Sequence, residues 1–268
     1  MCPIKTKDNH NINLDIEGKG KTLLCLHGFL GSSDDFRILK RLLKDDFKII
    51  SYDQRGFGCF NYDEPLDIKI LADDLCEVLK WIDEKVIVIG HSMGGSVILE
   101  YLKNYKDEFI DDCIFIESSP KMLNDEKYKD GLFKGTYTIK DLDRDLYLIE
   151  NEWESFLSLF IDKLFLNKKR EKEIALQKMK KIPNKIMSSL WKSLVLSDYL
   201  NDLKNIKKGV CVIRGEKSSF YTREAQKNFS NSFNKSSFGE IEDANHLIML
   251  EKPRELSELI KKYIVANF

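Results

Sequence analysis

A serine lies among closely spaced glycines in the segment Gly90-His91-Ser92-Met93-Gly94-Gly95. The apolar run Val86 to Ile89 precedes this segment and an amphipathic stretch follows it, so the pattern predicts a strand, a sharp turn and a helix. Glycines suit such a turn because backbones approach each other closely there. A bare G-x-S-x-G arises by chance in roughly one chain in ten, so its placement between these elements carries the prediction that Ser92 is a nucleophile.

A serine hydroxyl attacks a carbonyl only when a base takes its proton, and histidine is the usual base. The chain has four histidines. His91 is on the wrong side of the turn, His10 lies in a polar hairpin, and His27 belongs to another motif. His246 lies in a loop after the last predicted strand, at the sheet edge where the nucleophile turn emerges. We therefore expect His246 to be the base.

Backbone amides for an oxyanion hole are also expected. His27-Gly28-Phe29 directly follows the predicted strand Leu23 to Leu26, which is where one such amide is found in enzymes with this turn. The residue after the nucleophile supplies the other. The sequence therefore predicts that the N–H groups of Phe29 and Met93 bind the oxyanion.

Short apolar runs alternate with longer amphipathic segments up to about residue 120, a pattern typical of βαβ units around a mostly parallel sheet. Segments around Ile4 and Ile12 to Ile16 predict an antiparallel edge. From 121 to 203 only helix-forming stretches occur, and strands resume at Gly209. We expect a core made of 1–120 and 204–268 and a helical cap at 121–203. Besides this edge pair, four strands are expected before the cap, at Thr22 to Leu26, Phe47 to Tyr52, Lys85 to Ile89 and Cys113 to Ile116.

The motifs follow one another in a familiar order. Leu26-His27-Gly28-Phe29, Asp53-Gln54-Arg55-Gly56-Phe57-Gly58, the Ser92 turn and Ala244-Asn245-His246 resemble the successive signatures of the α/β-hydrolase superfamily over nearly the whole chain. This resemblance implies an α/β-hydrolase fold: a mostly parallel eight-stranded sheet, a helical cap inserted after the sixth strand, and catalysis without cofactor or metal. Asp53 and Arg55 are expected to be structural.

The acid of the triad departs from the common pattern of that superfamily. Many relatives carry an aspartate three residues after the glycine that ends the seventh strand, whereas Ser218 follows Gly215 here. The segment Ile114 to Pro120 resembles instead the esterase and haloperoxidase-like branch, in which the acid follows the sixth strand. That resemblance assigns the orienting acid to Glu117, with Glu216 or Asp243 as alternatives.

These residues predict a serine hydrolase that cleaves a carboxylic ester or thioester of a small to medium acyl group through an acyl-enzyme. A serine nucleophile argues against dehalogenase and epoxide hydrolase chemistry, while amidase, carbon–carbon hydrolase and perhydrolase activities stay open. A non-catalytic small-molecule receptor or interaction module on the same fold is the alternative. Six aromatic residues of 121–203 either line the acyl pocket or form the cap's own core, which their helical spacing favours: Phe133, Tyr137, Trp153, Phe156, Phe160 and Trp191.

The expected partner is a small-molecule ester or thioester substrate, and the composition argues against a nucleic-acid partner. The 43 basic residues nearly balance the 44 acidic ones, so the chain lacks the charge that non-specific nucleic-acid binding requires. No signal-peptide-like or membrane-spanning apolar run is present, which predicts a cytoplasmic protein without a membrane span. Six cysteines without a C-x-x-C pair are expected to be buried free thiols. The composition does not indicate an oligomeric state.

Overall fold

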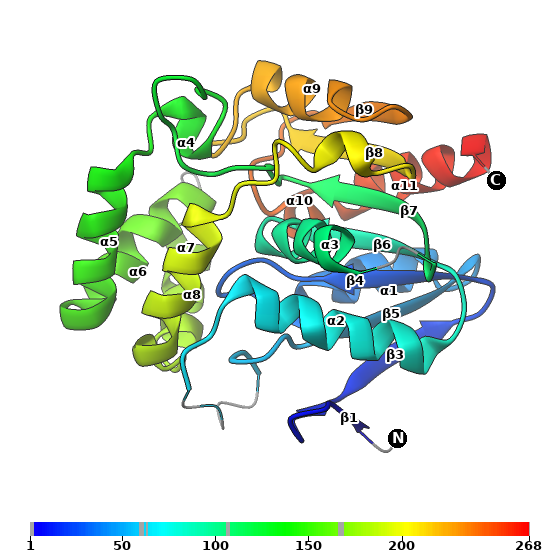
Figure 1. Ribbon diagram of the computed structural model, residues 1–268, viewed down its shortest axis with the longest axis horizontal. Coiled ribbons are helices and arrows are strands. Elements are labelled where there is room, and N and C mark those ends of the chain that lie inside the picture. Colours follow the sequence, from blue (N-terminus) through cyan, green and yellow to red (C-terminus); the bar gives the residue numbers. More distant parts are fainter. Residues whose placement is uncertain (1–2, 59–61, 63, 106–107, 166–168, 268) are drawn as a thin grey trace.

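The computed structural model describes residues 3–58, 62, 64–105, 108–165 and 169–267. A seven-stranded sheet in the order β3-β5-β4-β6-β7-β8-β9 forms its centre (Figure 1). All neighbouring strands are parallel except β3, which pairs antiparallel with β5 at the edge. The strands are β3 (Leu14–Gly18), β4 (Lys21–Leu26), β5 (Phe47–Tyr52), β6 (Val86–His91), β7 (Ile110–Ile116), β8 (Gly209–Gly215) and β9 (Ser236–Ile241).

The expected count of eight strands is wrong by one for the described residues. β1 (Ile4–Lys5) and β2 (Asn11–Ile12) form a separate two-stranded sheet, so only β3 extends to the edge of the main sheet. The reason is local. Thr6 and His10 bond to each other through backbone and side chain, which closes the hairpin on itself.

Two helical layers cover the sheet, and the side chains of each strand alternate between them. In β4, Leu24 and Leu26 pack into one apolar core and Leu23 and Cys25 into the other. This two-sided burial explains why the strands are continuous apolar runs. The first core contains α2 (Ile68–Ile82), α3 (Met93–Asn104) and α9 (Arg223–Asn231), and the second contains α1 (Arg37–Leu43), α10 (Ile248–Glu251) and α11 (Pro253–Asn267).

A group of helices, which we call the insertion helices, lies between β7 and β8 in the chain and beyond one end of the sheet (Figure 1). β7 is the fifth strand of the main sheet along the chain. The two ends of the insertion meet, because Lys121 forms an antiparallel bridge with Asp198. The insertion helices are α4 (Leu132–Gly135), α5 (Ile139–Asn151), α6 (Trp153–Leu164), α7 (Lys169–Met179) and α8 (Asn184–Leu196).

The structure bears on two expectations for the chain as a whole, those for the cysteines and for membrane-spanning helices. Cys25, Cys76, Cys113 and Cys211 are buried, as expected, and Cys25, Cys76 and Cys211 are free thiols, while Cys2 and Cys59 lie outside the described residues. Across the described ranges, no helix is both long enough and apolar enough to cross a bilayer.

Arg55 has the structural contacts expected of it. Its guanidinium binds both carboxylate oxygens of Asp74 on α2, at 2.9 and 2.6 Å, and both side chains are buried. It also pairs with Asp8 in the β1–β2 hairpin. Asp53, two residues earlier, accepts a hydrogen bond from the Ser33 amide at 2.7 Å. Arg55 therefore joins the hairpin to the helical layer.

Replacing Arg55 with alanine should destabilise the protein strongly, because it leaves the Asp74 carboxylate buried without its partner. We expect a loss of about 3–5 kcal/mol in the free energy of unfolding, measured by urea denaturation. The control is Lys69→Ala, which removes an exposed pair with Asp73 on the same helix and should cost less than about 0.5 kcal/mol. Equal losses in the two variants would contradict this account.

Candidate active site

Ser92 occupies a strained turn between β6 and α3. Its φ and ψ are 51° and −116°, a conformation that L-residues rarely adopt. Neighbouring groups hold it: the Ser92 amide donates to Ile116 O at 2.9 Å, and its carbonyl accepts from Ser118 Oγ at 3.0 Å and from the Gly95 amide at 2.9 Å. The end of β7 thus fixes the turn that presents the Ser92 side chain.

The glycines flanking Ser92 have the expected steric cause. A Cβ on Gly90 would lie 2.6 Å from the Gly95 nitrogen, and one on Gly28 would lie 2.8 Å from His91 Nδ1. Gly28 precedes Phe29, so the loop after β4 touches the Ser92 turn directly. Both glycines therefore leave room that a Cβ would fill: Gly90 for the backbone of Gly94 and Gly95, and Gly28 for the side chains of His91 and Ser92.

A buried carboxylate contacts the imidazole of His246. Glu117 Oε2 lies 3.0 Å from His246 Nδ1 and accepts a hydrogen bond from Ser218 Oγ at 2.6 Å. Its Oε1 accepts from the Gly215 amide at 2.8 Å, and the residue has no exposed surface. Ser218, which stands where many relatives carry the acid, thus donates to the acid on the neighbouring strand.

The two alternative acids lie elsewhere. Glu216 accepts from the backbone amide of Asp243, and Asp243 forms an exposed ion pair with Lys217 at 2.5 Å. These contacts stay within the turns after β8 and β9. Of the three candidate acids, Glu117 is the one that bonds to His246.

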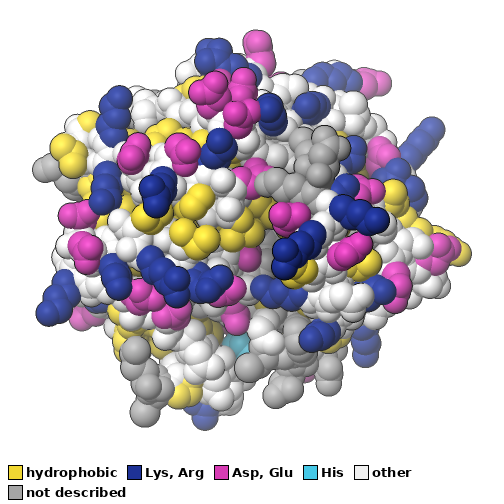
Figure 2. All heavy atoms as spheres, turned by 180° about the vertical axis from the view of Figure 1, so that it is seen from behind, with side chains coloured by type: hydrophobic (Ala, Val, Ile, Leu, Met, Phe, Trp, Pro, Cys, Tyr) yellow, Lys and Arg dark blue, Asp and Glu magenta, His cyan; other side chains and the backbone are white. Residues whose placement is uncertain are grey.

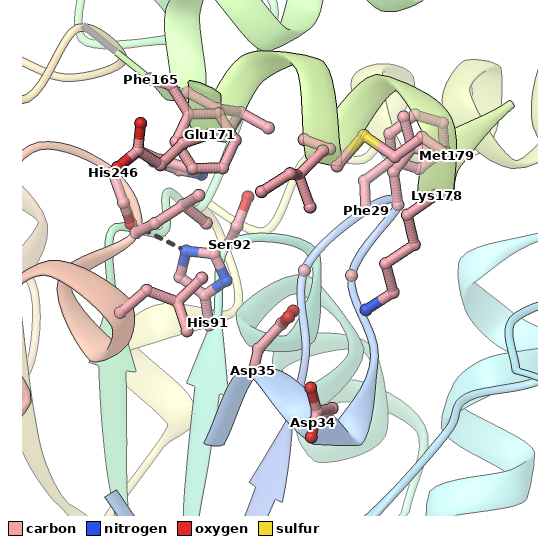
Figure 3. Close-up of a pocket in the computed structure, with 18 of the residues that line it drawn as sticks. Phe29, Asp34, Asp35, His91, Ser92, Phe165, Glu171, Lys178, Met179 and His246 are labelled. Carbon is pink, nitrogen blue, oxygen red and sulfur yellow. Dashed lines mark hydrogen bonds between the residues drawn. The ribbon is translucent and has the colours of Figure 1, made fainter. Parts of the chain in front are cut away.

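His246 is held by two further contacts that the sequence did not indicate. The ring of Phe220 stacks on its imidazole, with centroids 3.6 Å apart. His91 Nε2 lies 3.0 Å from the His246 carbonyl oxygen, so this nitrogen carries the proton and donates (Figure 3). His91, the residue before Ser92, therefore supports the backbone of His246.

Burial sets the protonation of this pair. It lowers the pKa of His246 to about 3, and it raises the pKa of Glu117 to about 7 against the opposing effect of the bonds from Ser218 and Gly215. Burial also lowers the pKa of His91 far below its usual value. His246 is consequently neutral at neutral pH, with Nδ1 directed at Glu117 and Nε2 left as a base.

Phe29 and Met93, the predicted oxyanion residues, both adjoin the Ser92 turn: Met93 directly follows Ser92, and Phe29 follows Gly28, on which a Cβ would lie 3.1 Å from Ser92 Cβ. Met93 is the first residue of α3, where an amide has no carbonyl partner within the helix. The loop of Phe29 is fixed by His27, whose Nδ1 lies 2.9 Å from Gly28 O and whose Nε2 accepts from the Gln54 amide at 2.9 Å. Two backbone segments are thus held next to the Ser92 turn.

Ser92 and His246 line one cavity of about 320 Å³. Figure 3 shows Ser92, His91 and His246 on one side of it, and Phe29, Lys178 and Met179 on the other. Most of the lining is apolar and comes from the loop after β4, α6, α7 and α10. Three exposed apolar side chains also line the cavity: Ile38, Ile174 and Leu250, which are 37%, 60% and 40% exposed. Figure 2, the view from behind Figure 1, shows hydrophobic side chains gathered between charged ones on that face of the molecule.

Most of the aromatic residues of the insertion belong to its core. Phe160 lines the cavity. Trp191 instead packs against Phe156 and Phe29, with ring centroids 5.9 and 4.9 Å apart, and its indole donates to Tyr137 Oη at 3.1 Å. The ring of Phe29 therefore anchors the loop after β4 to the insertion helices.

Metal ligands are not grouped in the part of the chain that the structure describes: no three or more His, Cys, Asp or Glu side chains there could hold an ion together. Besides Ser92, His91 and His246, the polar and charged side chains that line the cavity are Asp34, Asp35, Arg37, Glu171 and Lys178.

Comparisons with known proteins identify the family and the fold of the chain. A family model described as "alpha/beta hydrolase fold" matches residues 21–253. The chain is 23% identical to the AB hydrolase superfamily protein YisY of Bacillus subtilis over 97% of both chains. It is 34% identical to the esterase YbfF of Escherichia coli over 37% of this chain and 39% of that protein. It is 32% identical to an sn-1-specific diacylglycerol lipase of Xenopus laevis over 30% of this chain and 27% of the lipase.

The matched segment thus spans less than half of both the esterase and the lipase. Solved structures resemble the whole chain. The bromoperoxidase of Bacillus anthracis superposes with a TM-score of 0.88 at 19% identity, covering 98% of both chains. The esterase EaEST of Exiguobacterium antarcticum gives 0.86 at 21% identity, also covering 98% of both. These two likenesses establish the fold.

The pKa of His246 predicts a measurable pH response. In the folded protein the imidazole should stay neutral down to about pH 5, whereas in urea it should take up a proton near its ordinary pKa of 6.5. Because the unfolded chain then binds more protons, this residue's contribution to stability should decrease as the pH falls from 6.5 towards the folded pKa. Histidine NMR titration, assigned with His246→Ala, checks this. A folded-state titration near 6.5 would refute it.

Proposed function

Because the chain belongs to the alpha/beta hydrolase fold family, we propose that it is a serine hydrolase that cleaves a carboxylic ester or thioester of a small to medium acyl group. That it is a hydrolytic enzyme follows from the family and from its esterase and lipase relatives. The observation that carries the finer proposal is the contact between His246 Nδ1 and the buried Glu117, at the cavity that Ser92 also lines.

The proposed first step is acylation. His246 Nε2 takes the proton of Ser92 as the hydroxyl oxygen attacks the acyl carbonyl, and the amides of Phe29 and Met93 bind the resulting oxyanion. Glu117 holds the imidazole in the tautomer with Nδ1 protonated and stabilises the imidazolium. Collapse of the intermediate breaks the ester bond, and the leaving alcohol or thiol takes the proton from His246.

Deacylation repeats these roles with water. His246 accepts a proton from a water molecule as its oxygen attacks the acyl-enzyme carbonyl, and the second tetrahedral intermediate uses the same two amides. Its collapse returns the proton to Ser92 Oγ and releases the carboxylic acid. The scheme requires no metal or cofactor at any step.

The cavity supports the proposed substrate size. Its volume of about 320 Å³ lies at the lower end of the range of about 300–1,000 Å³ that is typical of small-molecule sites. Its apolar lining from Leu164, Ala175 and Met179 suits an uncharged chain better than a charged one. Short and medium acyl esters fit this space, whereas a long acyl chain would extend through the mouth.

Hydrolysis of p-nitrophenyl esters of increasing acyl length tests the proposal. Ser92→Ala and His246→Ala should each lower kcat by about a thousandfold or more, and Glu117→Gln by a smaller but still large factor. The matched control is Ser230→Ala, a buried serine that bonds Ser237 O at 3.2 Å far from the cavity. It should keep wild-type kcat.

Different outcomes separate the parts of the proposal. Wild-type activity in Glu117→Gln alone would remove Glu117 from the triad. A wild-type protein that hydrolyses none of the esters and resists a serine-directed fluorophosphonate would refute the serine hydrolase proposal and favour a receptor or interaction module.

A further inference from the structure

Asn245, directly before His246, connects the histidine loop to an insertion helix. Its side chain is buried, and its Nδ2 donates to Lys163 O and to Leu164 O, each at 2.9 Å. Both carbonyls belong to the last residues of α6. Both hydrogens of the Asn245 side-chain amide therefore bond to the C-terminal end of α6.

The end of α6 needs such donors. The last carbonyls of a helix have no partner within it, and leaving one buried without a hydrogen bond is unfavourable. The amide of Phe165, the residue after α6, satisfies Ile161 O. Asn245 provides partners for two of the carbonyls that follow, so a residue some eighty positions away completes the helix.

Ser219 completes the same junction from a third segment. Its amide donates to Asn245 Oδ1 at 2.8 Å, and its hydroxyl donates to Lys163 O at 2.6 Å. Ser219 follows Ser218, which bonds Glu117. We call Asn245, Ser219 and the Lys163 and Leu164 carbonyls the α6 clamp. The clamp joins the loop of the proposed base, the turn that supports its acid, and the end of α6.

The helix held by this clamp is a wall of the cavity. Phe160, Leu164 and Phe165 line it from α6 and the residue that follows. Figure 3 shows Phe165 on the same side of the cavity as His246. The position of this wall relative to His246 consequently depends on the hydrogen bonds of Asn245.

We propose that Asn245 is a positioning residue that sets the α6 wall relative to His246 and thereby the acyl-length selectivity of the enzyme. The inference rests on the proposed ester hydrolase function for its kinetic part. Its structural part, the coupling of α6 to the histidine loop, is testable without any activity.

The kinetic test compares Asn245→Ala with Asn184→Ala. Asn184 also donates a side-chain hydrogen bond to a helix carbonyl, Ile149 O at 2.9 Å, but this bond joins α8 to α5 and touches neither the clamp nor the cavity. We expect Asn245→Ala to raise KM for the best acyl length about five- to tenfold, with a smaller change in kcat, and to flatten the preference among acyl lengths. Asn184→Ala should lower Tm while leaving these ratios unchanged.

A second substitution separates donation from packing. Asn245→Asp keeps the size and the acceptor for the Ser219 amide but replaces the two donors with a carboxylate facing two carbonyls. If donation matters, this variant should lose at least as much selectivity as Asn245→Ala. Wild-type acyl-length ratios in both Asn245 variants would overturn the kinetic part of the proposal.

Hydrogen exchange gives the readout that is independent of activity. Peptides from residues 153–165 and from 243–250 should both exchange faster in Asn245→Ala, whereas Asn184→Ala should affect 139–151 and 184–196 instead. Unchanged exchange over 153–165 would overturn the coupling. Because this measurement needs no substrate, its failure is distinguishable from a wild-type protein that hydrolyses no ester.

Discussion

The carboxylate of Glu117 is enclosed by protein, and three donors from two segments reach it: His246 Nδ1 from the loop after β9, and Ser218 Oγ and the Gly215 amide from the end of β8 and the turn that follows. A buried carboxylate is costly unless its oxygens are paired, so the three donors cannot drift independently. The backbone of Glu117 adds to this, since its amide donates to Ile213 O at 2.9 Å from a left-handed conformation with φ 48°. The ends of β7 and β8 and the histidine loop are therefore fixed relative to one another around this one group.

Three buried histidines all have a lowered pKa, and they differ in the groups that they contact. Burial lowers the pKa of His27, His91 and His246 alike. His27 fixes the loop after β4, and His91 donates to the carbonyl of His246. Because a neutral imidazole can donate with one nitrogen and accept with the other, His27 links two backbone segments, and none of the three introduces a repelling charge beside the cavity.

The sequence predicted β4 to β8 well because each is a mostly apolar run buried on both faces, and that pattern depends on neighbouring residues alone. It also predicted the strand, turn and helix around Ser92, since the apolar run before the turn and the amphipathic stretch after it are local patterns. The strand count failed where side chains close a local hairpin, at Thr6 and His10. The donors to Glu117 and the α6 clamp could not be derived, because they depend on strand register, such as Ile116 beside Ile213, and on where a distant helix ends. The sequence showed that Ser218 stands where many relatives carry an aspartate, but not that its hydroxyl would donate to Glu117.

The bridge between Lys121 and Asp198, which also carries an ion pair of 3.0 Å between their side chains, brings the start and the finish of the insertion together at one point of the sheet edge. Segments whose ends meet in this way can be lengthened, shortened or exchanged with little strain on the scaffold that holds them. A different insertion could therefore join the sheet at this one point, but it would have to supply carbonyl groups for Asn245 and Ser219 so that the loop of His246 keeps its position.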